Sequence, residues 1–395
     1  MPTHVIRLST AVPWDRGSEL AKRIFYVSPE IEDFTLLREG DHVTGVKLGT
    51  VSRADPAELS RKLDTIVAKD VLPLRIPKSK TVWTSPHPNR VEDGLFAELE
   101  SAGEVIECGE GMYALGALFT DTMSVLDSRI RALAVGSFGA ARYRYPTLVP
   151  TDALRRGGYL DAFPQYLMTA SRFHADIDAY DAFVSGLASA DDAATHIGQF
   201  SQHLGYCLPP TMCFHTYHQL SGQEVPGGAA VITSRGKSFR FESRYRRSLE
   251  RLWDFTIREI VFLGDRQAVV EQRQRFMAAI LEMVTELGFA GHVEVANDPF
   301  FCNDLTPERM LAQHLMELKY ELRLPVEGGR TIAGGSFNIH GDTFGSAFGI
   351  TLPDGTAAHT ACAGLGLERL TYAFLCQHGL ETTHWPATVR EGLQA

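Results

Sequence analysis

The chain has 395 residues, of which 44% are hydrophobic and 22% are charged. This length allows one large core and a smaller appended domain, because single hydrophobic cores stop growing near roughly 250–300 residues. The composition is that of a soluble globular protein, and no apolar run approaches the roughly 20 residues that span a bilayer. The formal charge of −10 argues against a large non-specific nucleic-acid surface, which needs many lysines and arginines.

The N-terminus lacks the basic and then apolar pattern of a secretory signal, so we expect a cytoplasmic protein that does not contact a membrane. Six cysteines are present, without a repeating spacing and without a CxxC pair. In a reducing compartment they are expected to be thiols or metal ligands rather than disulfides.

The first 83 residues predict a small α+β unit of βαββα order, because segments of period-2 and of helical hydrophobicity alternate. In chain order, the expected elements are a strand over 5–12, a helix over 18–27, two strands within 34–50 and a helix within 56–72. The next segment, TSPHPNR (84–90), has two prolines and no periodicity. We therefore expect a small domain over 1–85 and a catalytic domain over 86–395.

The second domain is predicted to be an antiparallel sheet with helices packed on it, which makes the whole chain α+β rather than a doubly wound parallel fold. In chain order, the expected elements are a helix over 118–139, a strand over 141–150, a hairpin with strands at 229–234 and 238–247, a strand over 253–264, a helix over 266–288, β-rich sequence over 330–352 and a helix opened by the glycine-rich segment 361–379.

Arginine and aromatic residues mark the segment that follows Phe239. Arg240 and Glu242 come first, and Arg251 and Phe255 follow them. A guanidinium makes bidentate hydrogen bonds to phosphate, and an aromatic face can stack on adenine. The pattern favours a nucleotide-binding strand, loop and strand, although arginines that alternate with aromatic residues also occur on solvated strands.

A second segment places Arg369 just inside a helix, after Gly364 and Gly366. Glycine lets the backbone approach a ligand closely, and an arginine there can reach a phosphate. The segment is not the GxGxxG fingerprint of dinucleotide binders, because the third glycine is replaced and the βαβ context is missing. Taken alone, it fits an ordinary strand-to-helix turn equally well.

Together, and in this order, the two segments resemble motifs 2 and 3 of the class II aminoacyl-tRNA synthetases. Motif 2 is placed near 238–262, motif 3 near 360–376, and motif 1 near 130–150 with Pro146 as its proline. The resemblance implies a class II synthetase-type antiparallel β-sheet core flanked by helices. It also implies a homodimer formed through motif 1.

The same resemblance implies roles for the motif residues in binding ATP. Arg240 would hold the α-phosphate, and Phe255 would stack on adenine with Arg369 on the other face of the base. Arg251 and Arg369 would reach the distal phosphates. Arg240 and Arg369 are the expected catalytic residues, and Glu242 is expected in the same ATP-binding group.

Within this superfamily, the chain is most similar to the seryl-tRNA synthetases of methanogenic archaea and to their shortened bacterial relatives, the amino acid:carrier protein ligases. Both hold an active-site zinc with a Cys, a Glu and a second Cys, and Cys213, Glu259 and Cys362 stand at these positions. Two thiolates and a carboxylate on Zn²⁺ leave a fourth position open for the amine of an amino acid. His215 and His218 are alternative ligands, and buried cysteines without a metal are the remaining interpretation.

Three further residues, Lys319, Glu321 and Asn338, resemble the positions that contact the aminoacyl group in these enzymes. The acidic Mg²⁺ ligand common just before the Asn is replaced by Ala-Gly-Gly at 333–335. Glu242 or Glu321 could take its place. Small residues on both sides of Cys362 suit a small amino acid such as glycine, alanine or serine.

The implied reaction is the activation of a small amino acid with ATP, followed by transfer from the aminoacyl-adenylate to an acceptor. A phosphopantetheinylated carrier protein is expected rather than tRNA, because residues 1–83 hold 13 Lys and Arg against 11 Asp and Glu and only 26 residues follow Arg369. A seryl-type tRNA synthetase and a paralogue without catalysis are the alternatives.

A docking surface for the carrier is expected between motifs 2 and 3, where the relatives carry an inserted helix. The segment 306–322, TPERMLAQHLMELKYEL, is predicted as a helix in this interval. A plain amphipathic core helix is an equally good interpretation.

Overall fold

An eight-stranded sheet forms the centre of the computed structural model, which describes residues 2–21, 23–51, 54–73, 80–174, 176–190, 192–242, 248–296 and 317–393. Adjacent strands run antiparallel, except for the parallel pair of β11 and β7 at one edge. In spatial order the strands are β4 (Thr81–Thr84), β13 (His292–Val295), β14 (Lys319–Val326), β15 (Arg330–Gly341), β16 (His359–Gly366), β12 (Asp254–Gly264), β11 (Ala230–Phe239) and β7 (Ala141–Tyr143).

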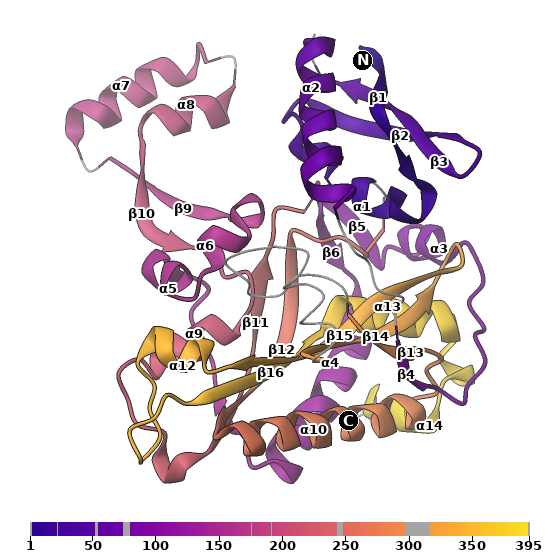
Figure 1. Cartoon of the computed structure of the whole chain (residues 1–395), viewed down its shortest axis with the longest axis vertical. Coiled ribbons are helices and arrows are strands. Elements are labelled where there is room, and N and C mark those ends of the chain that lie inside the picture. The colour runs from indigo at the N-terminus through magenta and orange to yellow at the C-terminus, as the bar shows by residue number, and fades with distance from the viewer. Residues whose placement is uncertain are drawn as a thin grey trace.

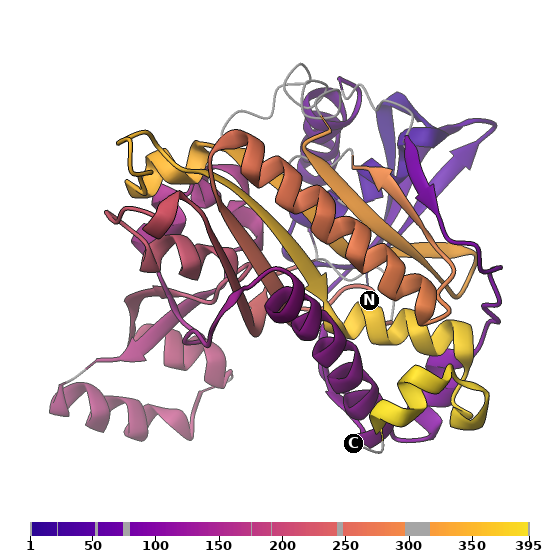
Figure 2. The same ribbon diagram turned by 90° about the horizontal axis from the view of Figure 1, so that it is seen from below.

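Helices cover both faces of this sheet. On one face lie α4 (Ala117–Ala132), α10 (Arg266–Glu286) and α13 (Leu367–His378), which share a large hydrophobic core with the strands (Figure 2). On the other face, a second core holds α5 (Thr151–Arg156), α9 (Cys213–Gln219) and α12 (Thr343–Phe348). The predicted fold class, an antiparallel sheet flanked by helices, is confirmed.

Strand periodicity decides which side chains reach which core, because successive residues point to opposite faces. On β16, Ala361 and Ala363 lie in the α4–α10–α13 core, whereas Cys362 lies in the core with α9 and α12. On β12, Ile260 and Val261 divide in the same way. Cys362 and its cross-strand partner Val261 therefore share the face that α9 covers. Every second residue counted from them along β16 and β12 points to that face as well.

A buried ion pair joins α4 to β12. Arg258 donates to Asp127 through Nε (2.7 Å) and Nη2 (2.9 Å), and both side chains are buried. Two parallel N–H···O bonds fix geometry as well as charge. Helix α4 is thereby fastened to β12, from the face opposite to Cys362.

The N-terminal unit has its own sheet and core. Its strands β1 (Thr3–Pro13), β2 (Ile31–Glu39) and β3 (His42–Thr50) are antiparallel in the order β1-β3-β2, and α2 (Pro56–Ile66) packs on one face. Asp55 caps α2 by accepting a hydrogen bond from the Ala57 amide. The βαββα order agrees with prediction, while the domain boundary near residue 85 stays a prediction.

The first predicted helix, over 18–27, is wrong in extent. The structure has α1 (Gly17–Ala21) and, separately, a 3₁₀ turn at Ile24–Tyr26. Ile24 and Val27 are β-branched, and two aromatic residues lie between them, so the second half of this segment favours a helix weakly.

Other predicted elements differ at their ends. The expected hairpin with strands at 229–234 and 238–247 is wrong in part, because β11 runs without a break from Ala230 to Phe239 and pairs with β12 along its whole length. Residues 243–247 of the expected second strand lie outside the described part of the chain. The β-rich prediction over 330–352 is wrong after Gly341, whose positive φ of 62° ends β15 before α12 begins. The expected strand over 141–150 is reduced to β7 and to β8 (Val149–Pro150).

The predicted helix over 306–322 is wrong at its end, because Lys319 begins β14. Alternating burial along β14 outweighs the helical pattern there. Residues 306–316 lie outside the described part of the chain, so the docking-helix prediction is untested.

An extension that was not predicted leaves the core between α6 (Tyr159–Ala162) and α9. It consists of β9 (Thr169–Phe173), α7 (Ile177–Leu187), α8 (Ala193–Gln199) and β10 (Ser201–Cys207), and it projects away from the large sheet (Figure 1). Among the described residues, no helix combines the length and the apolar character needed to cross a membrane.

Candidate active site

The structure brings Cys213, Glu259 and Cys362 together. Cys213 opens α9, Glu259 lies on β12, and Cys362 lies on the neighbouring strand β16. One possible ligand atom from each residue lies within 4.8 Å of the other two, and all three side chains are buried. In a tetrahedral zinc site, with Zn–S near 2.3 Å and Zn–O near 2.0–2.2 Å, such atoms are roughly 3.5–3.8 Å apart. The donor set therefore fits a zinc ion with small side-chain adjustments.

The pKa values of Glu259 and Cys362 also favour a metal ion at this cluster. Burial raises the pKa of Glu259 to about 7, despite hydrogen bonds from Cys362 and Thr211 that lower it. The hydrogen bond with Cys213, together with burial, raises the pKa of the Cys362 thiol well above its ordinary value. Without a cation, three acidic groups thus share one buried space, which a divalent metal ion would neutralise.

Three arginines gather beside this cluster around one carboxylate. Arg251 Nη1 donates to Glu242 Oε2 at 2.6 Å, and Arg240 Nε donates to the carbonyl oxygen of Pro210 at 3.1 Å. Burial lowers the pKa of Arg369, Glu242 opposes this effect, and the positive charges of Arg251 and Arg240 add to it. Three guanidinium groups around a single carboxylate make an electropositive surface suited to phosphate.

Phe255 lies on the same face of β12 as Glu259, four residues before it. The guanidinium of Arg240 lies over its ring, 5.4 Å from the ring centre. The predicted stacking of adenine between Phe255 and Arg369 stays a prediction.

Two glycines at the end of β16, Gly364 and Gly366, leave the floor of the site open. A Cβ on Gly364 would lie 3.5 Å from Glu259 Oε1, and a Cβ on Gly366 would have no closer neighbour than Arg369 Cβ at 4.0 Å. The two glycines follow Cys362 by two and four residues on β16, so they lie on the same face of the sheet as the cluster. A ligand can therefore approach the backbone of β16 beside Glu259.

The residues expected in the amino-acid pocket follow the same face of the sheet. Lys319 pairs with Asn338, and Asn338 pairs with Cys362, across β14, β15 and β16. Lys319 Nζ lies 2.8 Å from Glu321 Oε1. Asn338 Nδ2 lies 3.5 Å from Cys362 Sγ, while its Oδ1 is buried without a hydrogen-bond partner among the described residues. The cross-strand rows place these predicted residues on the face of the sheet that carries the cluster, and Asn338 contacts it.

Comparison with known proteins identifies the family. No family model matches the chain. The amino acid–[acyl-carrier-protein] ligase 1 of Bradyrhizobium diazoefficiens is 30% identical over 289 residues, which cover 72% of this chain and 86% of that protein. The chain belongs to the amino acid–[acyl-carrier-protein] ligases. It is therefore a ligase, and ligase 2 of the same organism is 29% identical over 307 residues, 77% of this chain and 86% of that protein.

The ligase is also similar to larger tRNA-charging enzymes. The type-2 serine–tRNA ligase of Methanothermobacter thermautotrophicus is 26% identical over 293 residues, which cover 72% of this chain but only 57% of that enzyme. The structure of M. kandleri SerRS, solved with A. aeolicus tRNASec, matches with a TM-score of 0.73 at 22% identity. That match covers 99% of this chain and 77% of the other, so the shared fold includes the N-terminal unit.

The two histidines considered as alternative metal ligands occupy other positions in the ligase. His215 is buried and stacks on Tyr145 at 5.2 Å, and burial, with the charge of His218, lowers its pKa to about 4. His218 is exposed. Within the described part of the chain, neither histidine belongs to the group of candidate metal ligands.

Several residues near the cluster were missed by sequence reasoning. Thr211 Oγ1 donates to Glu259 Oε2 at 2.8 Å, and His340 Nε2 lies 3.6 Å from Cys362 Sγ. Tyr159 has a buried hydroxyl without a hydrogen-bond partner among the described residues, and burial raises its pKa although Arg240 lowers it. His340 could have been found, because it follows Asn338 by two residues on a strand and so shares its face.

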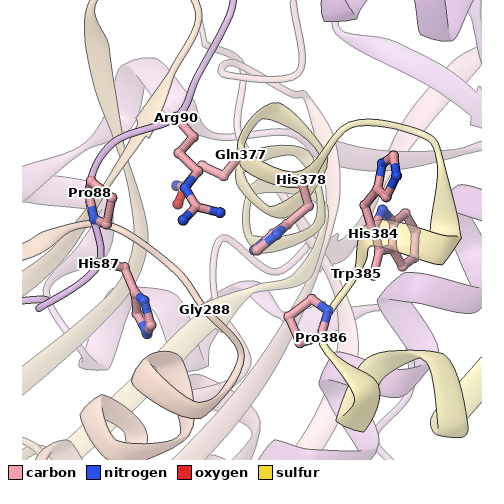
Figure 3. Close-up of a pocket in the computed structure, with 9 residues that line it drawn as sticks. All are labelled: His87, Pro88, Arg90, Gly288, Gln377, His378, His384, Trp385 and Pro386. Atoms are coloured by element: carbon pink, nitrogen blue, oxygen red, sulfur yellow. The ribbon is translucent and has the colours of Figure 1, made fainter.

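A separate cavity of about 280 Å³ lies at the other end of α13 (Figure 3). Two of its polar side chains hold the fold together: Gln377 accepts a hydrogen bond from the Ala290 amide, and Trp385 donates to the carbonyl oxygen of Gly379. His87 contacts the carbonyl oxygen of Thr285. No predicted site residue lines this cavity.

Proposed function

We propose that the ligase activates a small amino acid with ATP and transfers it to the phosphopantetheine thiol of a carrier protein. The observation that carries this proposal is the proximity of two groups, which lie close enough for the charge of Arg240 to lower the pKa of Glu259. Cys213, Glu259 and Cys362 form one group, and the arginines around Glu242 form the other. The first group suits an amine through a metal, and the second suits phosphates.

In the first step, the carboxylate of the amino acid attacks the α-phosphorus of ATP and pyrophosphate leaves. Arg240 would bind the α-phosphate, while Arg251 and Arg369 would bind the distal phosphates, so that charge is neutralised where it develops. Phe255 would support the adenine ring. These roles follow from the family resemblance and the position of each side chain beside Glu242.

In the second step, the carrier thiol attacks the carbonyl carbon of the aminoacyl-adenylate, and AMP leaves as the thioester forms. The thiol proton is released when the sulfur attacks. Because AMP departs from the arginine group, the guanidinium groups that bind ATP would also stabilise the leaving phosphate.

Two metals are part of the proposal. Cys213, Glu259 and Cys362 would hold Zn²⁺, which would supply an open coordination position for the amine of the amino acid. The two candidates for Mg²⁺ fit less well, because Glu242 is ion-paired with Arg251 and Glu321 with Lys319. No step is assigned to Mg²⁺. The homodimer and the cytoplasmic location stay predictions.

The experiment for the first step is amino acid-dependent exchange of labelled pyrophosphate into ATP, with each common amino acid, with and without a zinc chelator. We expect exchange with one or a few small amino acids and its loss after chelation. No exchange with any amino acid would favour the alternative of a paralogue without catalysis.

The acceptor requires a second assay, because relatives with both acceptors resemble this chain. Phosphopantetheinylated carrier protein, the same carrier without phosphopantetheine, and bulk tRNA are offered in parallel. We expect label only on the first. Label on tRNA alone would contradict the proposal and support the seryl-type synthetase.

A further inference from the structure

A network of buried polar side chains contacts Cys362, one of the candidate metal ligands. His340, near the end of β15, has Nε2 3.6 Å from Cys362 Sγ. On the other side of its ring, Nδ1 lies 3.1 Å from Thr360 Oγ1 and 3.3 Å from Tyr217 Oη. Tyr217 and Thr360 are fully buried and His340 is 9% exposed. This network of side chains therefore joins β15, β16 and α9 beside the sulfur atom of Cys362.

The partners of the ring determine where its proton lies. A neutral imidazole has one N–H donor and one acceptor nitrogen, and burial favours the neutral form. Two hydroxyl groups face Nδ1, and each can donate to it. In the tautomer that carries its proton on Nε2, Nδ1 accepts from these hydroxyl groups and the Nε2 proton is directed to Cys362 Sγ.

Aromatic packing holds this orientation. Phe344 contacts the edge of the His340 ring, with centroids 4.9 Å apart and planes at 73°. Tyr217 stacks on Phe344 at 4.3 Å, which also places the tyrosine hydroxyl beside the histidine. Rotation of the imidazole would break these contacts together with its hydrogen bonds.

The two sulfur atoms of the cluster have different surroundings. Cys362 Sγ faces two nitrogen atoms, His340 Nε2 at 3.6 Å and the amide Nδ2 of Asn338 at 3.5 Å. Cys213 Sγ faces the hydroxyl of Thr211 at 3.8 Å. Hydrogen bonds to a thiolate stabilise its negative charge and fix its direction, as outer-sphere partners do in metal sites generally.

We propose that His340 is a positioning residue that donates a hydrogen bond to the Cys362 thiolate, and that Thr360 and Tyr217 set its orientation. It acts through Cys362 rather than as a ligand, because within the described residues it is not part of the group of candidate ligands. The inference rests on the proposed function, since it requires that this cluster binds a metal ion.

The test uses the full chain loaded with Co²⁺, whose thiolate-to-metal charge-transfer band reports the sulfur ligands. His340→Leu removes the donor, and we expect about 10- to 100-fold weaker binding of Co²⁺ and Zn²⁺ in chelator competition, with a shifted band. His340→Gln keeps an N–H donor and should recover part of the affinity. His359→Leu, on neighbouring β16, is the matched control and should behave as wild type.

Variants that keep the shape of the core cover the case in which His340→Leu does not fold. Tyr217→Phe combined with Thr360→Val removes both hydroxyl partners of Nδ1. We expect this variant to weaken metal binding and shift the band in the same direction. Unchanged affinity and spectrum in either folded variant would overturn the role of His340.

The experiment distinguishes an error in the role of His340 from an error in the metal site itself. If wild type binds metal and Cys362→Ala loses it, while the His340 and hydroxyl variants match wild type, only the positioning role is wrong. If wild type binds no metal at this cluster, the metal part of the proposed function is wrong as well.

Discussion

Arg251 Nη1 and Glu242 Oε2 lie 2.6 Å apart and join the two sides of the segment between β11 and β12. Burial alone would raise the pKa of the Glu242 carboxyl. The charges of Arg251, Arg369 and Arg240 outweigh burial and hold that pKa below its ordinary value. One ionised carboxylate thus keeps three guanidinium groups together before ATP is present.

This relationship predicts a pH-dependent contribution to stability. A carboxyl whose pKa is lowered by folding stabilises the protein above its unfolded pKa of about 4.3, and the contribution is lost as the pH falls through the lower folded value. We expect Glu242→Gln to be less stable than wild type at pH 7, with the difference decreasing below about pH 4. Urea unfolding at several pH values measures it.

Glu92→Gln, at an exposed glutamate, is the control and should follow wild type at every pH. A difference between Glu242→Gln and wild type that is constant from pH 7 to the acid limit of folding would contradict the argument.

Arg240 provides a direct test of the nucleotide site. Arg240→Ala should lower kcat/KM for pyrophosphate exchange by roughly 10²–10³-fold, the usual cost of losing a donor to developing charge. Arg235→Ala, on the same β11 but paired with Asp127 on the α4 side, is the control and should remain near wild type. Equal losses in both variants would show that the effect is structural.

Sequence patterns were sufficient where a local signal and the sheet agree. The strand predicted over 253–264 is β12, whereas β16 was not predicted as a strand. The resemblance of the motifs placed Glu259 and Cys362, which cross-strand pairing then brings to one face. Cys213 reaches them because α9 packs on that face. No local pattern could predict this packing, so its place in the site depended on the resemblance alone.

The sequence was least informative where tertiary partners decide the structure. His340 has the parity of Asn338, but its role depends on Tyr217 and Thr360, which come from other elements. The extension with α7 and α8 was not predicted. Lys319 was expected in a helix, because its place in β14 is determined by the strands on both sides.

The Asp127–Arg258 pair predicts a large effect on stability. Asp127→Ala leaves a buried guanidinium without its partner, which typically costs about 3–5 kcal/mol in the free energy of unfolding. Denaturant unfolding should show this loss. Asp121→Ala, at an exposed position on the same helix, should change stability by no more than about 0.5 kcal/mol. A similar small change in both variants would contradict the prediction.

The space beside Gly364 is expected to limit the size of the amino acid substrate. A methyl group there would lie in ordinary contact with Glu259, 3.5 Å from Oε1, so Gly364→Ala should fold normally. The methyl group would occupy space beside the cluster and should reduce kcat/KM for serine relative to glycine by roughly tenfold. Exchange assays with both amino acids measure the ratio. Gly198→Ala, in α8 of the extension, where the added carbon meets nothing within 4 Å, should leave the ratio unchanged.

Measuring the metal content tests the proposed zinc ligands without relying on enzyme activity. We expect about one zinc ion per chain in the purified wild type, and none in Cys213→Ala or Cys362→Ala, because two thiolates supply most of the affinity for zinc in such a site. Cys376→Ala removes another buried cysteine, in α13 and outside the cluster, and should retain the metal. Elemental analysis after dialysis measures all four proteins. Zinc that remains in Cys362→Ala at the wild-type ratio would contradict the assigned ligands, whereas zinc lost from Cys376→Ala alone would move the site to the other end of the core.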